Sequence, residues 1–188
     1  MIAPEEQARA NFYALLARLF YGPADAALLL GIASEKLEGD LAAPWEELAR
    51  AAAAAHPLAV REEYEMAFIG TGKAPVTLYT IAYTLRHASE TPLAELRGEL
   101  ARLGLARRAE AGEPEDHIAA LCDVMRHLVA EQKNDLEEQR RFFNRWIQPA
   151  IDPLCGAIER SDKTAFYKPV ARFAKGFCTL EHMAFEML

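Results

Sequence analysis

Two adjacent residues near the middle of the chain, Asp116 and His117, have side chains suited to acid–base chemistry or to binding a ligand. A carboxylate that orients an imidazole is a common arrangement around a general base. Adjacent residues of a helix point about 100° apart, however, so their spacing alone does not create such a pair. No nucleophile motif accompanies them. Two interpretations remain open: a histidine that bonds local backbone at a helix start, or a residue that binds a ligand.

Metal and nucleotide sites are not indicated by the remaining chemistry-bearing residues. His117, Cys122 and His127 would share one helix, but each step of five residues turns about 140° around its axis, so they do not converge on one ion. The stretch Gly70–Lys73 has the composition of a phosphate-binding loop. It lacks the required spacing and a preceding strand, so a glycine loop that ends a helix is expected. We expect no metal, no cofactor and no enzymatic activity.

The overall charge and the termini restrict the partners and the compartment. A net charge of -7 and a pI near 5.3 disfavour nucleic-acid binding, which requires a basic face. Three widely spaced cysteines without a C-x-x-C pattern fit a reducing compartment. The N-terminus has no secretory signal, and no apolar stretch approaches the roughly 20 residues that span a bilayer. A cytoplasmic protein without stable membrane insertion is expected.

The elements that must position Asp116 and His117 are helices. The stretch 113–133 is predicted to form one helix, because apolar residues recur in it at three- and four-residue spacing. Pro114 suits the first helical turn, where its missing N–H is not needed. Glu115 and Asp116 would then lie at the positive end of the helix dipole. Asp116 and His117 should therefore mark the point where a core helix meets the surface.

The rest of the chain is also predicted to be helical, since alanine and leucine abound and β-branched residues are sparse. We expect one all-α domain over residues 1–188, a bundle of about eight to eleven helices. Thr91 and the pair Ser161-Asp162 are expected to cap helices. Pro149 and Pro153 are expected to interrupt the pattern. The further helices are expected near residues 4–21, 25–37, 44–55, 58–69, 79–87, 91–103, 135–147, 154–159 and 161–188. Residues 70–78 should form an ordered loop, and residues 107–112 should link the helix before them to the central one.

Five stretches carry a resemblance that covers most of the chain in the correct order. They are Arg9–Leu16 (RANFYALL), Glu63–Gly70 (EYEMAFIG), Gly72–Tyr79 (GKAPVTLY), Glu113–Ile118 (EPEDHI) and Phe142–Pro149 (FFNRWIQP). Together they resemble the TorD/DmsD/NarJ family of redox-enzyme maturation chaperones. Ala67 stands where the family's second element usually has leucine. The stretch Tyr79–Tyr83 has Ile81 where many members have a serine, which predicts a difference in how the leader is recognised.

The resemblance implies an all-helical, TorD-like chaperone that binds the N-terminal, usually twin-arginine, leader of a molybdenum-cofactor oxidoreductase. It holds this client until cofactor insertion and folding are complete. The implied partners are the leader and the catalytic subunit, with a preference for formate dehydrogenase suggested by the loop after Gly70. Relatives occur as monomers and as helix-swapped dimers. A monomer with a minor dimer is therefore expected, with residues 104–112 as the hinge for helix exchange. The alternative is a chaperone that acts on the client body, or delivers molybdenum cofactor to a non-exported enzyme of the nitrate reductase type.

The residues predicted to contact the leader join the family's Asp-His motif to the loop that precedes it. They are Phe68, Gly70, Pro75, Leu78, Tyr79, Tyr83, Pro114, Asp116 and His117. The aromatic members could instead belong to the core, since tyrosine is commonly half-buried. The acidic residues Glu62, Glu63 and Glu65 form either a solvated helix face or a rim that attracts the leader's arginines, for which carboxylates are the natural partners.

Overall fold

The computed structural model describes residues 3–70, 72–84, 91–108, 111–130 and 135–188. Within these ranges the chain forms ten α-helices, a short 3₁₀ helix, a π-helical turn and no strand, so the all-α prediction is confirmed. The helices are α1 (Pro4–Tyr21), α2 (Ala26–Ser34), α3 (Ala42–Ala54), α4 (Pro57–Tyr64), α5 (Ile81–Thr84), α6 (Pro92–Arg102), α7 (Ile118–Ala130), α8 (Leu136–Trp146), α9 (Gln148–Arg160) and α10 (Tyr167–Glu186). The 3₁₀ helix is Gly39–Leu41, and the π-turn is Glu65–Ile69.

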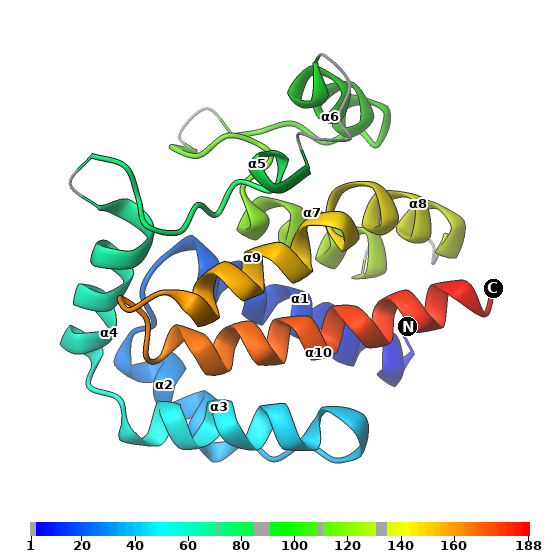
Figure 1. Cartoon of the computed structure of the whole chain (residues 1–188). Helices are drawn as coiled ribbons and strands as arrows, with labels where there is room; N and C mark the ends of the chain where they lie inside the picture. The colour runs from blue at the N-terminus through cyan, green and yellow to red at the C-terminus, as the bar shows by residue number, and fades with distance from the viewer. Residues whose placement is uncertain (1–2, 71, 85–90, 109–110, 131–134) are drawn as a thin grey trace.

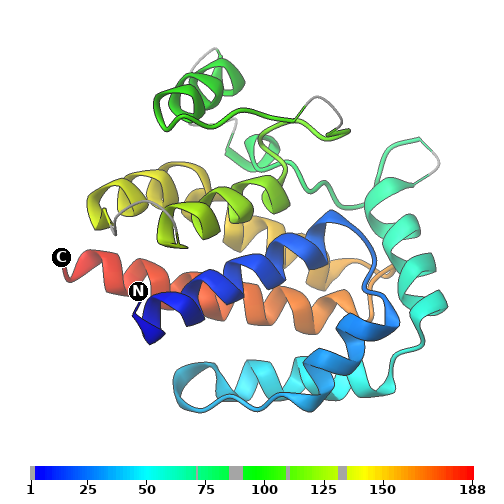
Figure 2. The ribbon, with the colours of Figure 1, turned by 180° about the vertical axis from the view of Figure 1, so that it is seen from behind.

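The long C-terminal helix α10 lies in the middle of the molecule, with α9 on one side of it and α3 on the other (Figure 1). Helix α1 packs along α7, while α2 and α3 pack together at the end of the molecule opposite α6 (Figure 2). The core between α1 and α10 is aromatic: the rings of Tyr13 and Phe177 meet edge to face at 4.8 Å. This core also contains the buried carboxylate of Glu181, which accepts hydrogen bonds from Arg9 at 2.7 Å and from the Tyr13 hydroxyl at 2.8 Å. The carboxylate is thus paired and hydrogen-bonded, as a buried charge must be.

Helix α7 has the amphipathic face that its sequence predicts, but it begins later. Its buried residues are Ile118, Ala119, Leu121, Cys122, Met125, Leu128 and Val129. The prediction that Pro114 lies in the first helical turn, with Glu115 and Asp116 at the helix dipole, is wrong, because the helix begins at Ile118. The backbone groups of 116–118 pair with an earlier segment instead of continuing the helix toward its N-terminus. Residues 131–133, which the predicted helix included, lie outside the described part of the chain.

Three further expectations about helix ends are corrected. Pro149 and Pro153 do not separate two helices: Pro149 lies in the first turn of α9 and Pro153 inside it. Both prolines are exposed, so water can hydrate the carbonyl group that Pro153 leaves without a donor. Thr91 makes no side-chain cap bond to α6. Of the predicted short helix 79–87, residues 81–84 are helical, and 85–87 lie outside the described residues.

The N-terminus of α10 is capped from α4, not by Ser161-Asp162. The carboxylate of Glu63 accepts from the backbone N–H groups of Ala165, Phe166 and Tyr167 at 2.8, 3.0 and 2.8 Å. A negative charge placed there satisfies otherwise unpaired donors and favours the positive end of the helix dipole. Glu63 therefore holds two distant segments of the chain together.

Helix α6 is attached to α8 largely by polar contacts. The indole N–H of Trp146 donates to Glu99 at 2.6 Å, and Arg102 donates to both oxygens of Glu138 at 2.5 and 2.8 Å. Gly104 follows with φ +74°, a left-handed conformation that favours glycine at a helix end. The chain then runs through 105–117 to reach α7, and part of this connection forms a wall of the site described next.

Candidate functional site

Two segments far apart in sequence, 78–80 and 116–118, pair through a short antiparallel bridge. The backbone N–H of Thr80 donates to the carbonyl oxygen of Asp116 at 2.9 Å, and that of Ile118 donates to the carbonyl oxygen of Leu78 at 2.9 Å. The Thr80 hydroxyl donates to the same Asp116 carbonyl at 3.2 Å. The structure thus brings together four of the predicted site residues: Leu78, Tyr79, Asp116 and His117. We call this contact the bridge junction.

His117 is oriented by its own helix. Its Nδ1 atom accepts a hydrogen bond from the backbone N–H of Ala119 at 3.2 Å, which caps the first turn of α7. Burial lowers the pKa of the imidazole, and the nearby carboxylate of Glu113 acts in the opposite direction. The neutral ring must therefore carry its proton on Nε2, since Nδ1 is an acceptor. His117 thus bonds local backbone, which is the first of the two interpretations left open by the sequence. It also lines a pocket, and ligand binding by His117 stays a prediction.

Asp116 has a positioning role in this arrangement. Asp116 is 6% exposed. Burial raises the pKa of its carboxyl group, whereas a hydrogen bond from the backbone N–H of Ile81 lowers that pKa. The carboxylate thereby meets the start of α5, and the carbonyl group of the same residue holds Thr80. Asp116 thus fixes the loop against the helix start.

Tyr79 extends the bridge junction toward solvent. Tyr79 is 36% exposed, and its ring and the imidazole of His117 meet edge to face with 5.5 Å between ring centres. The phenol donates to the Glu113 carboxylate at 2.5 Å. This bond, together with partial burial, raises the pKa of Tyr79 to about 12. Tyr79 and Glu113 thereby connect the loop after the π-turn to the segment that precedes α7.

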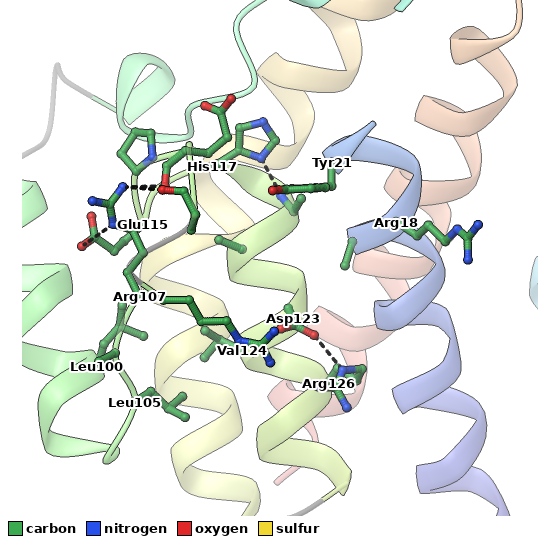
Figure 3. Close-up of a pocket in the computed structure, with 18 of the residues that line it drawn as sticks. Arg18, Tyr21, Leu100, Leu105, Arg107, Glu115, His117, Asp123, Val124 and Arg126 are labelled. Carbon is green, nitrogen blue, oxygen red and sulfur yellow. Dashed lines mark hydrogen bonds and ion pairs between the residues drawn. The ribbon is translucent and has the colours of Figure 1, made fainter. Parts of the chain in front are cut away.

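A pocket of about 580 Å³ opens beside the bridge junction. Its walls come from α1, from α7 and from the connection between α6 and α7, and His117 and Tyr21 lie at one end (Figure 3). Small or aliphatic side chains supply its apolar surface: Ala14, Ala17, Leu100, Leu105, Ala120 and Val124. Charged residues surround them, including Arg18, Arg107, Glu115, Asp123 and Arg126. A pocket of this size, with an apolar surface bordered by charged groups, suits a bound side chain or a short peptide segment.

The other predicted contact residues are distributed unevenly around this pocket. Pro114 lines it together with His117. Phe68 is buried in the core, where its ring meets Tyr167 edge to face, and Leu78 is buried as well. Tyr83 is half-buried, and its hydroxyl donates to the carbonyl oxygen of Thr77 at 2.8 Å. Phe68 and Leu78 therefore support the loop, Pro114 and His117 line the pocket, and Tyr79 is exposed beside it.

Gly70 and Pro75 shape the loop between the π-turn and the bridge junction. Gly70 has φ +63°, and its N–H donates to the carbonyl oxygen of Glu65 at 2.7 Å, closing the π-turn. A Cβ atom there would also lie 3.2 Å from the Cα atom of Ala74. Pro75 is exposed. These two residues set the path of the loop, and a role for either in contacting a leader stays a prediction.

Two pocket residues, Tyr21 and Glu113, were missed by reasoning from the sequence. Tyr21 is the last residue of α1 and is 63% exposed. The sequence signal that could have found it is an aromatic residue directly before Gly22-Pro23. Glu113 adjoins the Pro114–His117 motif, but only the fold shows that its side chain reaches Tyr79.

The described residues also bear on metal binding, reactive thiols and membrane-spanning helices. In those ranges, no group of three or more histidine, cysteine or acidic side chains is arranged to hold a metal ion. The three thiols are buried, and burial raises the pKa of each, which keeps them protonated and unreactive. None of the helices that the structure describes is long and apolar enough to cross a bilayer.

Comparison with known proteins identifies similar chains. Residues 34–156 match the model of the family described as "Nitrate reductase delta subunit". A protein named "Chaperone protein TorD" from Photobacterium profundum is 25% identical over 125 residues, which cover 61% of this chain and 58% of the relative. A protein of the same name from Aliivibrio fischeri is 28% identical over 129 residues, covering 61% and 59%. The chain thus spans a little under three fifths of the length of these curated relatives.

Proposed function

The chain belongs to the nitrate reductase delta subunit family, the TorD/NarJ group that its motifs predict, and from this premise we propose that it is a maturation chaperone for a molybdenum-cofactor oxidoreductase. In this proposal it is not an enzyme. It binds the N-terminal leader of its client, of the twin-arginine type, and holds the client until cofactor insertion and folding are complete.

The observation that carries the proposal is the position of the family's Asp-His motif. Asp116 and His117 lie at the bridge junction, and His117 opens onto a pocket with an apolar surface and a charged rim. A leader has the matching chemistry, a basic segment followed by an apolar one. Burial of one leucine-sized side chain contributes about 1.5–3 kcal/mol, and rim charges add orientation and a faster association.

The small alanine side chains of the pocket leave space for a ligand between two helices. Ala14 and Ala17 of α1 and Ala120 of α7 leave room between two helices that otherwise pack closely. An apolar segment of the leader can enter there as a helix or as an extended strand. Release requires only that folding of the client weakens its contact with the chaperone, since a ligand shifts an equilibrium by its difference in affinity.

A second candidate function is favoured by the description of the matching family, which names nitrate reductase. In that alternative the chain binds the folded body of a catalytic subunit and assists cofactor delivery, and the leader is not the main contact.

Co-purification separates the two functions. The chain is expressed with the catalytic subunit of a molybdenum oxidoreductase from the same genome, once with its leader and once without it. Leader binding predicts that removing the leader abolishes co-purification. Retention of the leaderless subunit at full yield would contradict it and favour binding to the client body. Formate dehydrogenase is the first client to test, because of the loop sequence after Gly70.

A further inference from the structure

Glu113 differs from the other carboxylates that line the pocket. Glu115 accepts from Arg97 at 3.0 and 3.1 Å, and Asp123 accepts from Arg126 at 2.7 Å. Within the described ranges, the side chain of Glu113 has one hydrogen-bond partner, the neutral phenol of Tyr79. Two of the three pocket carboxylates are thus neutralised by arginines of the protein, whereas the structure supplies Glu113 with no cation.

Aromatic rings lie on the same side of the pocket as this carboxylate. Tyr79 contacts it directly, and the imidazole of His117 lies against the ring of Tyr79. Tyr21 lines the same end of the pocket with most of its surface exposed (Figure 3). Burial raises the pKa of Tyr64 to about 12, and the charge of Glu113 acts in the same direction. Tyr64 itself is buried, and its hydroxyl donates to the carbonyl oxygen of Phe20 at 3.0 Å. The exposed aromatic groups near Glu113 are therefore Tyr79 and Tyr21, beside a histidine that burial keeps neutral near pH 7.

Such a group has the chemistry that recognises a guanidinium ion. The planar guanidinium of arginine bonds a carboxylate through two parallel N–H groups and stacks on aromatic faces. An attraction between a cation and an aromatic face contributes about 0.5–2 kcal/mol, more when water is excluded. A phosphate or carboxylate ligand would instead meet the charge of Glu113 at this end of the pocket.

Four arginines line the pocket, Arg18, Arg107, Arg108 and Arg126, and three of them have bonding partners in the protein. Arg18 donates to Asp25 at 2.5 Å, and Arg126 bonds Asp123. Arg107 donates to the carbonyl oxygens of Ala111 and Glu113 at 3.1 and 3.2 Å. Carboxylates compensate the charges of Arg18 and Arg126, and Arg107 lies 4.0 Å from Glu115. Within the described residues none of these arginines is paired with the carboxylate of Glu113, which leaves that carboxylate for a ligand.

We propose that Glu113, with the exposed rings of Tyr21 and Tyr79, is the site that binds an arginine side chain of the leader. The inference rests on the proposed function and assigns one contact within it. Without a ligand, the Tyr79 hydroxyl donates its hydrogen bond to the carboxylate of Glu113. An entering guanidinium replaces this hydrogen bond by a bidentate ion pair, and the Tyr79 ring remains as the surface on which it stacks.

Calorimetric titration with synthetic leader peptides tests the site. The peptides come from molybdenum oxidoreductases of the same genome, each in its native form and with its paired arginines replaced by glutamine. The proteins are the wild type, Glu113→Gln, Tyr79→Phe and the control Glu62→Gln. Glu62 is an exposed carboxylate on α4 that does not line the pocket. Thermal melting checks that every variant is folded.

The site predicts a specific coupling between protein and peptide. Glu113→Gln should weaken binding of the arginine peptide about tenfold, the scale of one charged hydrogen-bonded contact, and should leave the glutamine peptide within about twofold. Tyr79→Phe removes the competing hydroxyl but keeps the ring, so it should strengthen the arginine peptide about threefold. Glu62→Gln should alter neither affinity.

Contrary results distinguish this inference from the proposed function. If Glu113→Gln weakens both peptides equally, or neither, Glu113 does not bind the arginine. Weaker binding of the arginine peptide by Tyr79→Phe would refute the exchange of partners. If the wild type binds none of the leaders, the proposed function itself fails.

Discussion

Removal of the Glu63 carboxylate should destabilise the protein although the side chain is half-exposed and lies outside the pocket. Its two oxygens accept three backbone N–H groups at the start of α10, at 2.8, 3.0 and 2.8 Å. Loss of a helix cap costs about 0.5–2 kcal/mol. Loss of a negative charge beside the positive end of a helix adds about 0.3–1 kcal/mol. We therefore expect Glu63→Ala to lower the free energy of unfolding by about 2 kcal/mol.

Urea denaturation followed by far-UV circular dichroism measures this loss. The midpoint should fall while the slope with denaturant stays constant, because the same surface is exposed on unfolding. For a chain of this size, about 2 kcal/mol corresponds to a melting temperature lower by about 4–8 °C. Glu63→Gln keeps one acceptor oxygen and should lie between Glu63→Ala and the wild type.

Glu62→Ala is the matched control, since Glu62 is exposed on the same helix. It should lie within about 0.5 kcal/mol of the wild type, as most surface substitutions do. If Glu63→Ala is equally mild, the cap does not stabilise α10 and the explanation of this helix start is wrong. A stabilising role also argues against Glu63 as part of an acidic rim that attracts the leader.

Three further predictions concern the site and the assembly. Because burial lowers the pKa of His117, the unfolded chain binds a proton there at higher pH than the folded one. The free energy of unfolding should therefore not depend on this group above about pH 6.5, and it should fall as the pH decreases below that value. His117→Asn, whose amide oxygen can still accept from Ala119, should reduce this fall, measured as the urea midpoint against pH. Tyr79→Ala should raise the dissociation rate of an immobilised leader at both low and high salt, because it removes an aromatic contact that salt does not screen; an unchanged rate would place the groove elsewhere. Light scattering should find a monomer with a slowly formed minor dimer exchanged at the 104–112 connection, and a dimer at every concentration would contradict this.

The sequence predicts most helices because their signals are local. The ends of α1 follow from Pro4 and from Gly22-Pro23, and the buried face of α7 follows from three- and four-residue spacing. The start of α7 was misplaced because the competing interaction is not local. Asp116 and Ile118 bond to Leu78 and Thr80, some forty residues earlier, and no property of 113–118 alone reveals that partner.

The same distinction explains the cap of α10 and the interior proline of α9. Ser161-Asp162 has the composition of a helix cap, but the functioning cap is Glu63, about a hundred residues away. Pro153 reads as a helix breaker, yet the exposed side of α9 tolerates it because water reaches the free carbonyl group. Long-range partners and solvent exposure decide both cases.

The candidate site was predicted in part. Family motifs indicated Tyr79, Asp116 and His117, and the structure brings these three residues together. The opposite wall of the pocket comes from α1 and from the α6–α7 connection, which no local pattern assigns to a site. Glu113 and Tyr21 consequently emerge only once α1, the connection and α7 are placed side by side.

The central claim is that a client leader binds in the pocket between α1, α7 and the α6–α7 connection. Isothermal titration of a cognate leader into the wild type and Val124→Trp tests it most directly, because Val124 lines the pocket and a tryptophan there would obstruct the space between the helices. Leu30→Trp, at an exposed position of α2 away from the pocket, is the control. The prediction is binding by the wild type and by Leu30→Trp, with a loss of at least about tenfold in Val124→Trp. Equal affinity of a folded Val124→Trp variant would contradict the assignment of the leader to this pocket.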